Sequence, residues 1–124
     1  MSSAAAVIVD TSVWRKYLAG VSSARPLGQL LDEDAVLLHP FVLGELTLGG
    51  LSDREGSLLR RLSGVPIADH ADVLAFVSKR GLARKGIGWV DAHLLASTLL
   101  ADARLWSTDR ALIAAARTLG VAFA

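Results

Sequence analysis

The chain has 124 residues and a net charge of +1, and its 52% hydrophobic content excludes a disordered protein. This length predicts one domain, residues 1–124, around a single core. The chain has no cysteine, which excludes disulfides, thiolate zinc sites and cysteine nucleophiles. Apolar runs such as 4–9 are far shorter than the ~20 residues that span a bilayer. No basic segment precedes that run, so we expect a cytoplasmic protein with neither a membrane span nor a signal peptide.

Short strand patterns alternate with helical patterns along the chain. The apolar run at 5–9 predicts a parallel strand that is covered on both faces. Further strands are predicted at 36–38, 65–67, 104–106 and 121–123. The strand at 65–67 should lie at an edge of the sheet, because Pro66 cannot donate to a ladder.

Capping residues and apolar periodicity predict the helices between these strands. Asp10 and the two hydroxyl residues after it can cap a helix at 13–19. The Ser52–Glu55 pattern is a capping box, and Asp109 can cap a helix that runs to Leu119. Other helices are predicted at 26–31, 40–48, 71–79 and 90–101. The alternation predicts the α/β class, as a three-layer α/β/α sandwich with a mainly parallel central sheet.

Four acidic residues stand out against this fold. Asp10 and Asp109 come just after predicted strands, and sheets of this kind place their sites at the carboxyl ends of the strands. Glu45 and Asp91 lie in helices that are otherwise largely apolar, where a carboxylate costs several kcal/mol unless it is paired or binds a cation. Taken singly, each has an ordinary interpretation: a helix cap for Asp10 and Asp109, a charge at a helix N-terminus for Asp91, a solvent edge for Glu45.

Together, the four carboxylates favour a metal site. Two carboxylates 4 Å apart repel each other by ~1–4 kcal/mol, depending on screening. A cluster of anions therefore needs cations, and hard oxygen ligands suit Mg²⁺ or Mn²⁺. The histidines at 39, 70 and 93 match no metal-binding spacing, so we interpret them as structural or surface residues.

The rest of the chain is basic. When the four carboxylates are set aside, 13 basic side chains face 8 acidic ones, which gives a net charge of +5. Four basic residues fall within seven positions: Lys79, Arg80, Arg84 and Lys85. An acidic pocket in a basic surround suits RNA phosphates, although a solvated helix end would also explain this cluster. The three tryptophans are more typical of a core than of a surface that stacks on bases. Trp89 is the best candidate for an exception, because glycines flank it and Asp91 follows closely.

These motifs resemble the PIN domain and, more narrowly, the VapC toxins. The resemblance covers nearly the whole chain and rests on Val-Asp-Thr-Ser-Val-Trp at 9–14, Gly-Glu-Leu at 44–46, Val-Asp-Ala-His-Leu-Leu-Ala at 90–96 and Ser-Thr-Asp at 107–109. It implies that Asp10, Glu45, Asp91 and Asp109 are catalytic and hold one or two Mg²⁺ or Mn²⁺ ions. Ser107, where the family often has threonine, would support them by a hydrogen bond, and Ser12 would act similarly beside Asp10.

The resemblance also implies an activity and partners. The protein would be a metal-dependent endoribonuclease, the toxin of a toxin–antitoxin pair, that cleaves structured RNA (tRNA or rRNA) by metal-activated water and leaves a 5′-phosphate. It would form a homodimer and be silenced by a cognate VapB-like antitoxin. The helix pair at 40–62 is a candidate for the antitoxin contact, or else ordinary core.

Four other functions fit parts of the sequence. A PIN nuclease of RNA maturation or decay would carry the same acids, and a PIN-fold scaffold without activity would keep the fold alone. A phosphoacceptor receiver domain should have a lysine after its last strand, where only Ala124 follows Phe123. A phosphatase of the haloacid-dehalogenase type should have a second aspartate where Ser12 stands.

Overall fold

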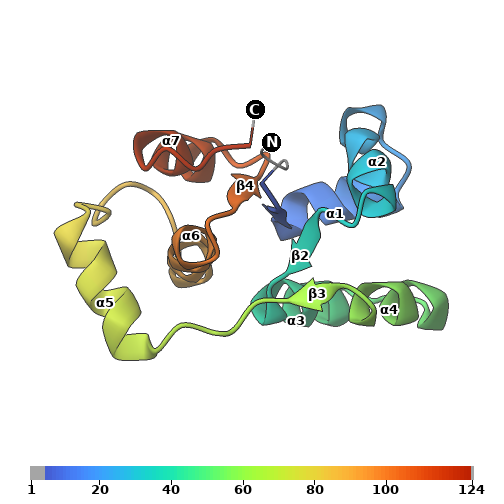
Figure 1. Ribbon diagram of the computed structural model, residues 1–124, viewed down its shortest axis with the longest axis horizontal. Helices are drawn as coiled ribbons and strands as arrows, with labels where there is room; N and C mark the ends of the chain where they lie inside the picture. The colour runs from blue at the N-terminus through green and yellow to red at the C-terminus, as the bar shows by residue number, and fades with distance from the viewer. Residues whose placement is uncertain (1–4, 124) are drawn as a thin grey trace.

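The computed structural model describes residues 5–123 and shows a four-stranded sheet between two groups of helices (Figure 1). The strands are β1 (Val7–Val9), β2 (Val36–Leu38), β3 (Ser63–Gly64) and β4 (Arg104–Trp106). Their order is β3-β2-β1-β4, and every neighbouring pair is parallel. Val7 pairs with Val36 on one side and with Arg104 on the other. The predicted α/β class and parallel sheet are confirmed.

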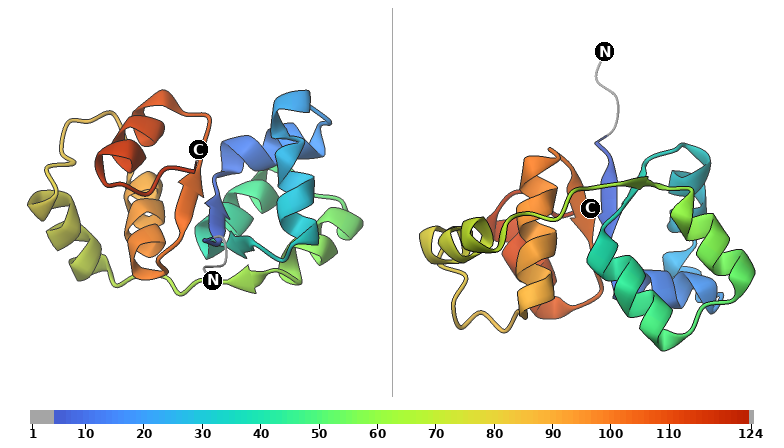
Figure 2. Two further views of the ribbon diagram at one scale, coloured as in Figure 1. Left: turned by 45° about the horizontal axis from the view of Figure 1, so that its top comes forward. Right: turned by 90° about the horizontal axis from the view of Figure 1, so that it is seen from below.

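Helices cover both faces of this sheet (Figure 2). One side carries α1 (Thr11–Leu18), α2 (Pro26–Asp32), α3 (Pro40–Gly49) and α4 (Asp53–Arg60), with the 3₁₀ turn η1 (Ser22–Ala24) between α1 and α2. The other side carries α5 (His70–Lys79), α6 (Trp89–Leu100) and α7 (Arg110–Thr118). The result is the predicted three-layer arrangement.

The core lies on both faces of β1. Val7, Ile8 and Val9 are at most 1% exposed, which explains why this strand reads as an unbroken apolar run. Trp14 on α1 packs on one side, and the fully buried leucines of α6 pack in the same cluster. The two strand ends that carry Asp10 and Ser107 are therefore fixed by the best-packed part of the molecule.

Three strand predictions differ from the structure, and the first is β1, which begins at Val7 instead of residue 5. The edge strand is β3 at Ser63–Gly64 instead of 65–67, and Val65 contributes only a bond from its N–H to the Leu38 carbonyl oxygen, 3.1 Å. Pro66 has no N–H and stays outside the ladder, as its chemistry requires. At 121–123 there is a single bridge between Leu105 and Ala122 in place of a strand.

Helix ends differ by one or two residues from the predictions. α1 begins at Thr11 instead of residue 13, because Asp10 is itself the N-cap and its side chain accepts from the Thr11 N–H. α6 begins at Trp89, after Gly88, and α4 ends at Arg60, before Leu62. The capping box of Ser52 and Glu55 is present as predicted.

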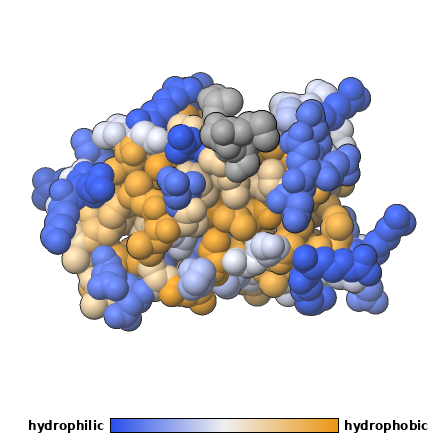
Figure 3. Space-filling model, in the orientation of Figure 1, coloured by the Kyte–Doolittle hydropathy of each residue, from blue (hydrophilic) through white to orange (hydrophobic). Residues whose placement is uncertain are grey.

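The surface carries both apolar and hydrophilic side chains. Figure 3 shows apolar atoms across the middle of one face and hydrophilic side chains gathered toward both ends. None of the helices described within residues 5–123 has the length and apolarity needed to cross a bilayer.

Candidate active site

Asp10 is held where β1 meets α1, and only 8% of the residue is exposed. Its Oδ1 accepts from the Thr11 N–H at 2.8 Å, and its Oδ2 accepts from the hydroxyls of Ser12 and Ser107, both at 2.8 Å. Three donors on one carboxylate satisfy a charge that would otherwise be costly to bury. Asp10 is therefore held in a fixed position at the carboxyl end of β1.

The two serines that bond Asp10 are themselves fixed by backbone donors. The Ser12 hydroxyl accepts from the Thr108 N–H at 3.2 Å, and the Ser107 hydroxyl accepts from the Asp109 N–H at 3.0 Å. Each hydroxyl proton must therefore point at Asp10. This network ties the end of β4 to the start of α1, residues almost one hundred positions apart in sequence.

Glu45 reaches the same region from α3. It is half-buried, and its Oε1 accepts from the Thr11 hydroxyl at 2.8 Å. Thr11 is a site residue that the sequence did not predict: it is buried directly after Asp10 and connects that acid to Glu45. Nothing local in the sequence predicts the contact, because 34 residues separate the two side chains.

Asp91 lies at the N-terminal end of α6. Its Oδ2 accepts from the Gly88 N–H at 3.1 Å, so the carboxylate folds back onto the first turn of the helix. Burial raises the pKa of Asp91 above its usual value, the Gly88 N–H opposes this, and the negative charges of Asp10, Asp109 and Glu45 raise it further. Asp91 therefore lies close enough to all three of the other carboxylates to feel their charge.

Asp109 is the most exposed member of the group. It is the N-cap of α7, and its Oδ1 accepts from the Leu112 N–H at 2.9 Å. Its backbone N–H is tied to Ser107, which links it to Asp10 through a single hydroxyl. The cap that the sequence predicts for Asp109 is present, and it leaves Oδ2 outside that bond.

The four carboxylates are neighbours, but their side chains are spread apart. Within residues 5–123, no three acidic or histidine side chains are close enough together to hold a metal ion as placed. In Glu45, Asp91 and Asp109, one carboxylate oxygen is engaged in the bond described above, and the second oxygen is outside it. The donor set, carboxylate oxygens alone, suits Mg²⁺ or Mn²⁺.

A row of five rings joins the helices that carry Glu45 and Asp91. Successive ring centroids lie 5.0, 4.9, 4.9 and 4.9 Å apart along the row His39, Phe41, His93, Trp89 and His70. The contact between Phe41 of α3 and His93 of α6 is the crossing point. Phe41 lies one helical turn before Glu45, and His93 lies two residues after Asp91, so this contact joins the helical turns that carry the two acids.

Two of the three histidines in this row are buried and the third is exposed. His39 and His93 are 0% and 3% exposed, while His70 is on the surface. Burial, and then the charge of His93, lowers the pKa of His39 to about 4. Burial and His70 lower the pKa of His93. Both buried rings are therefore neutral near pH 7, as expected for structural histidines.

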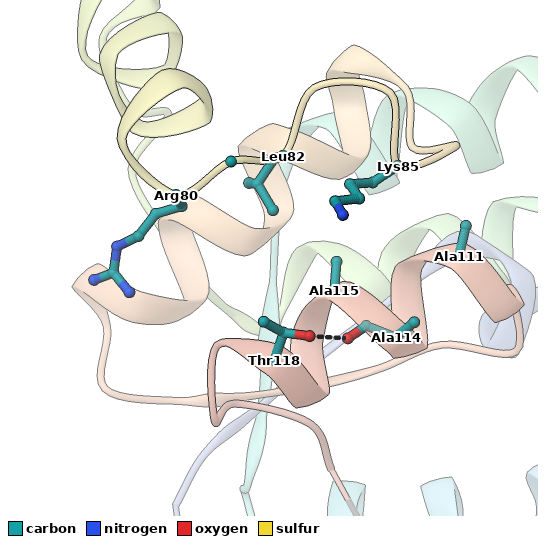
Figure 4. A pocket seen from close by; sticks show the side chains of 8 residues that line it. Arg80, Leu82, Lys85, Ala111, Ala114, Ala115 and Thr118 are labelled. Carbon is teal, nitrogen blue, oxygen red and sulfur yellow. Dashed lines mark hydrogen bonds between the residues drawn. The ribbon is translucent and has the colours of Figure 1, made fainter.

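The four basic residues predicted to bind RNA lie at the end of α5 and in the loop before α6, and all four are exposed. Arg80 and Lys85 line a pocket between this loop and α7 (Figure 4). In that view Lys85 extends toward α7, whereas Arg80 points outward. The residues thus share one region of the surface but do not converge on a single point.

Comparison with known proteins places this arrangement in a family. The sequence pattern of the PIN domain matches residues 7–118, a span that includes the four carboxylates. The chain belongs to the PIN domain family. This PIN domain is also 41% identical to ribonuclease VapC32 of Mycobacterium tuberculosis over 121 residues, in two strains, which covers 95% of this chain and 96% of the relative. The resemblance to VapC ribonucleases that the sequence predicts is confirmed.

Solved structures agree on the fold. This PIN domain superposes on the crystal structure of PAE2754 from Pyrobaculum aerophilum with a TM-score of 0.59 and 16% identity, over 92% of this chain and 81% of that one. FitAcB from Neisseria gonorrhoeae gives a TM-score of 0.57 and 20% identity, over 90% and 93% of the two chains. At identities this low, the likeness concerns the fold alone.

Proposed function

We propose that this PIN domain is a metal-dependent endoribonuclease that acts as the toxin of a toxin–antitoxin pair. The observation that carries the proposal is the position of Asp91, a half-buried carboxyl whose pKa is raised by burial and by the charges of Asp10, Asp109 and Glu45. Like charges held together in this way destabilise the protein unless a cation binds them. The similarity to ribonuclease VapC32 over nearly the whole chain supports RNA as the substrate.

Asp10, Glu45, Asp91 and Asp109 would hold one or two Mg²⁺ or Mn²⁺ ions. A bound ion of this kind lowers the pKa of water and stabilises negative charge on a phosphate. The chain's own contribution is positional: Ser12 and Ser107 hold Asp10, and Thr11 holds Glu45, so that these carboxylates need little reorganisation. The second oxygens of Asp91 and Asp109 lie outside their cap bonds and are available to turn toward a cation.

The substrate we propose is structured RNA, tRNA or rRNA, cut in a single-stranded loop where unpaired bases can be recognised. The exposed residues Lys79, Arg80, Arg84 and Lys85 would attract the phosphate backbone from beside the acidic site. The basic surface would first draw RNA in, and the cations would then hold its phosphate over the acids.

A VapB-like antitoxin and a second copy of the chain are the partners we propose. Leu48, at the end of α3, is 91% exposed, and Leu58 on α4 is 41% exposed. A partner bound to this helix pair would cover both of these exposed apolar side chains. The helix pair α3–α4 therefore fits the predicted antitoxin contact, and because α3 also carries Glu45, a partner bound there would lie next to the acids.

The test is cleavage of total cellular RNA by the partner-free protein, with Mg²⁺, with Mn²⁺ and with EDTA. Asp91→Asn should abolish cleavage, because it removes one of the acids but keeps an acceptor for the Gly88 N–H. Asp53→Asn is the matched control, since Asp53 is an exposed acid in the first turn of another helix, α4.

Mapping of the new ends identifies the RNA that is cut. We expect metal-dependent cuts with 5′-phosphates in the wild type and in Asp53→Asn, and none in Asp91→Asn. A folded wild-type protein that makes no cuts with either metal would contradict the proposal and favour an inactive PIN-fold scaffold.

A further inference from the structure

Trp89 is a large aromatic side chain that the fold leaves exposed. It is the first residue of α6 and is 39% exposed, whereas Trp14 is fully buried and Trp106 is half-buried against Phe123. Single exposed apolar residues are common and need no function. The surroundings of Trp89 are what set it apart.

The ring of Trp89 is held in position by two imidazoles. His93 meets it edge to face at 4.9 Å and 85°, and His70 meets it at 4.9 Å and 55°. His93 is in turn buried and packed against Phe41 of α3. The indole is therefore braced by the packing between helices, so a ligand that stacks on it would cost little ordering of the side chain.

Solvent reaches this fixed ring, because Trp89 is 39% exposed. The preceding residue, Gly88, has no side chain, and a Cβ built on it would meet no atom within 4 Å apart from its two chain neighbours. His70, on the other side of the contact, is exposed. A planar group can therefore approach the indole from solvent.

Trp89 also lies at the same end of α6 as Asp91. The Asp91 carboxylate folds back to the Gly88 N–H, so it lies on the first turn of the helix that Trp89 begins. Through Asp91 this turn is coupled to the charges of Asp10, Asp109 and Glu45. An RNA phosphate held over the acids would place a nearby nucleotide within reach of the indole, because a helix with its side chains is only ~10 Å across.

We propose that Trp89, braced by His70 and His93, stacks on an unpaired base of the RNA close to the bond that is cut. This inference rests on the proposed ribonuclease function and adds a residue that selects single-stranded substrate. Stacking tolerates any base, because every base has a π face, so Trp89 would favour unpaired nucleotides without reading their sequence. An aromatic ring that stacks on one base typically strengthens binding roughly 5- to 150-fold.

The test compares binding to two fluorescein-labelled 12-nucleotide oligonucleotides in EDTA, which prevents metal-dependent cleavage. One is single-stranded RNA of mixed sequence, and the other has the same phosphates but abasic sugars. Trp89→Leu should bind the RNA at least fivefold more weakly and the abasic strand unchanged, and Trp89→Phe should keep most of the affinity for RNA. Leu100→Ala is the matched control, since Leu100 is an exposed apolar residue at the opposite end of the same helix.

Two results would overturn the proposal. One is equal affinity of Trp89→Leu and the wild type for RNA. The other is an equal loss on both oligonucleotides, which would assign the effect to the backbone contacts or to the fold. If the wild type cleaves RNA with Mn²⁺ while either result holds, only the stacking proposal falls. If the wild type neither binds nor cleaves RNA, the proposed function falls and the stacking proposal falls with it.

Discussion

At the scale of single residues, the buried Asp10 and the half-buried Asp91 differ in how their charge is satisfied. Asp10 accepts three hydrogen bonds from Thr11, Ser12 and Ser107. Asp91 accepts one, from Gly88, and burial together with three neighbouring acids raises its pKa. Asp10 therefore has more donors than Asp91, in which the ionised form is destabilised.

This difference predicts opposite effects of two isosteric substitutions on stability in metal-free buffer. A carboxyl with a raised pKa in the folded state destabilises the protein at pH 7 and ceases to do so once the pH falls below its unfolded pKa. Asp91→Asn should therefore keep or raise the melting temperature. Asp10→Asn replaces one carboxylate oxygen by an NH₂ group, which faces donors instead of accepting from them. This substitution should lower the free energy of unfolding by ~1–3 kcal/mol. Calorimetry in EDTA measures both, and a greater loss for Asp91→Asn would contradict this assignment.

The positions of the acids could be predicted from the sequence, but their hydrogen bonds could not. The strand before Asp10 and the apolar helix around Asp91 are local patterns. From the sequence alone, we would expect Asp10→Asn and Asp91→Asn both to keep or raise the melting temperature, because each removes one charge from a cluster of like charges. Only the fold brings Ser107 to Asp10 and Thr11 to Glu45, because these pairs are 97 and 34 residues apart.

At the scale of elements, α3 begins at a histidine that also packs against α6 through the ring row. His39 is the N-cap of α3: its Nδ1 accepts from the Phe41 N–H at 3.0 Å, and its Nε2 is buried without a partner in the described part of the chain. The sequence predicts the start of this helix from Pro40 alone. It could not predict the row, because no spacing rule relates His39 and Phe41 to residues on α5 and α6.

The neutral cap predicts acid sensitivity. The pKa of His39 falls from 6.5 to about 4 on folding, so its contribution is fully present above pH 6.5 and is lost as the pH falls toward 4. At pH 5 the loss is about 2 kcal/mol. Urea unfolding at pH 7.5, 6 and 5 measures it. His39→Asn keeps a capping acceptor without a titratable ring, so its stability should fall less over this range; an equal fall would assign the acid sensitivity to other groups.

At the scale of the whole molecule, the alternation of strands and helices predicts the layers correctly, since each parallel strand needs a crossover helix. The weakest strands could not be placed by pattern. β3 has two residues, and the segment at 121–123 forms one bridge, so their positions depend on neighbours instead of their own sequence. α5 and α4 lie at opposite ends of the molecule (Figure 1), and the four predicted RNA-binding residues lie at the α5 end.

The basic surface at the α5 end predicts salt-dependent RNA binding. Replacing Lys79, Arg80, Arg84 and Lys85 together by glutamine should weaken binding and flatten the dependence of affinity on salt by roughly 0.7 per lost phosphate contact. The control replaces four exposed arginines elsewhere, Arg25, Arg54, Arg60 and Arg61. Titrations of a single-stranded RNA in EDTA from low to high salt measure both slopes. An unchanged slope for the first variant would remove these residues from the RNA surface.

The proposed function requires that Asp10, Glu45, Asp91 and Asp109 form one cation site, for which their side chains must turn toward one another. The most direct measurement is a calorimetric titration of the protein with Mn²⁺. It compares the wild type, Asp91→Asn and the control Asp53→Asn. We expect the wild type and Asp53→Asn to bind Mn²⁺ alike, and Asp91→Asn to bind it at least tenfold more weakly. Equal affinity in all three proteins would contradict the proposed cation site.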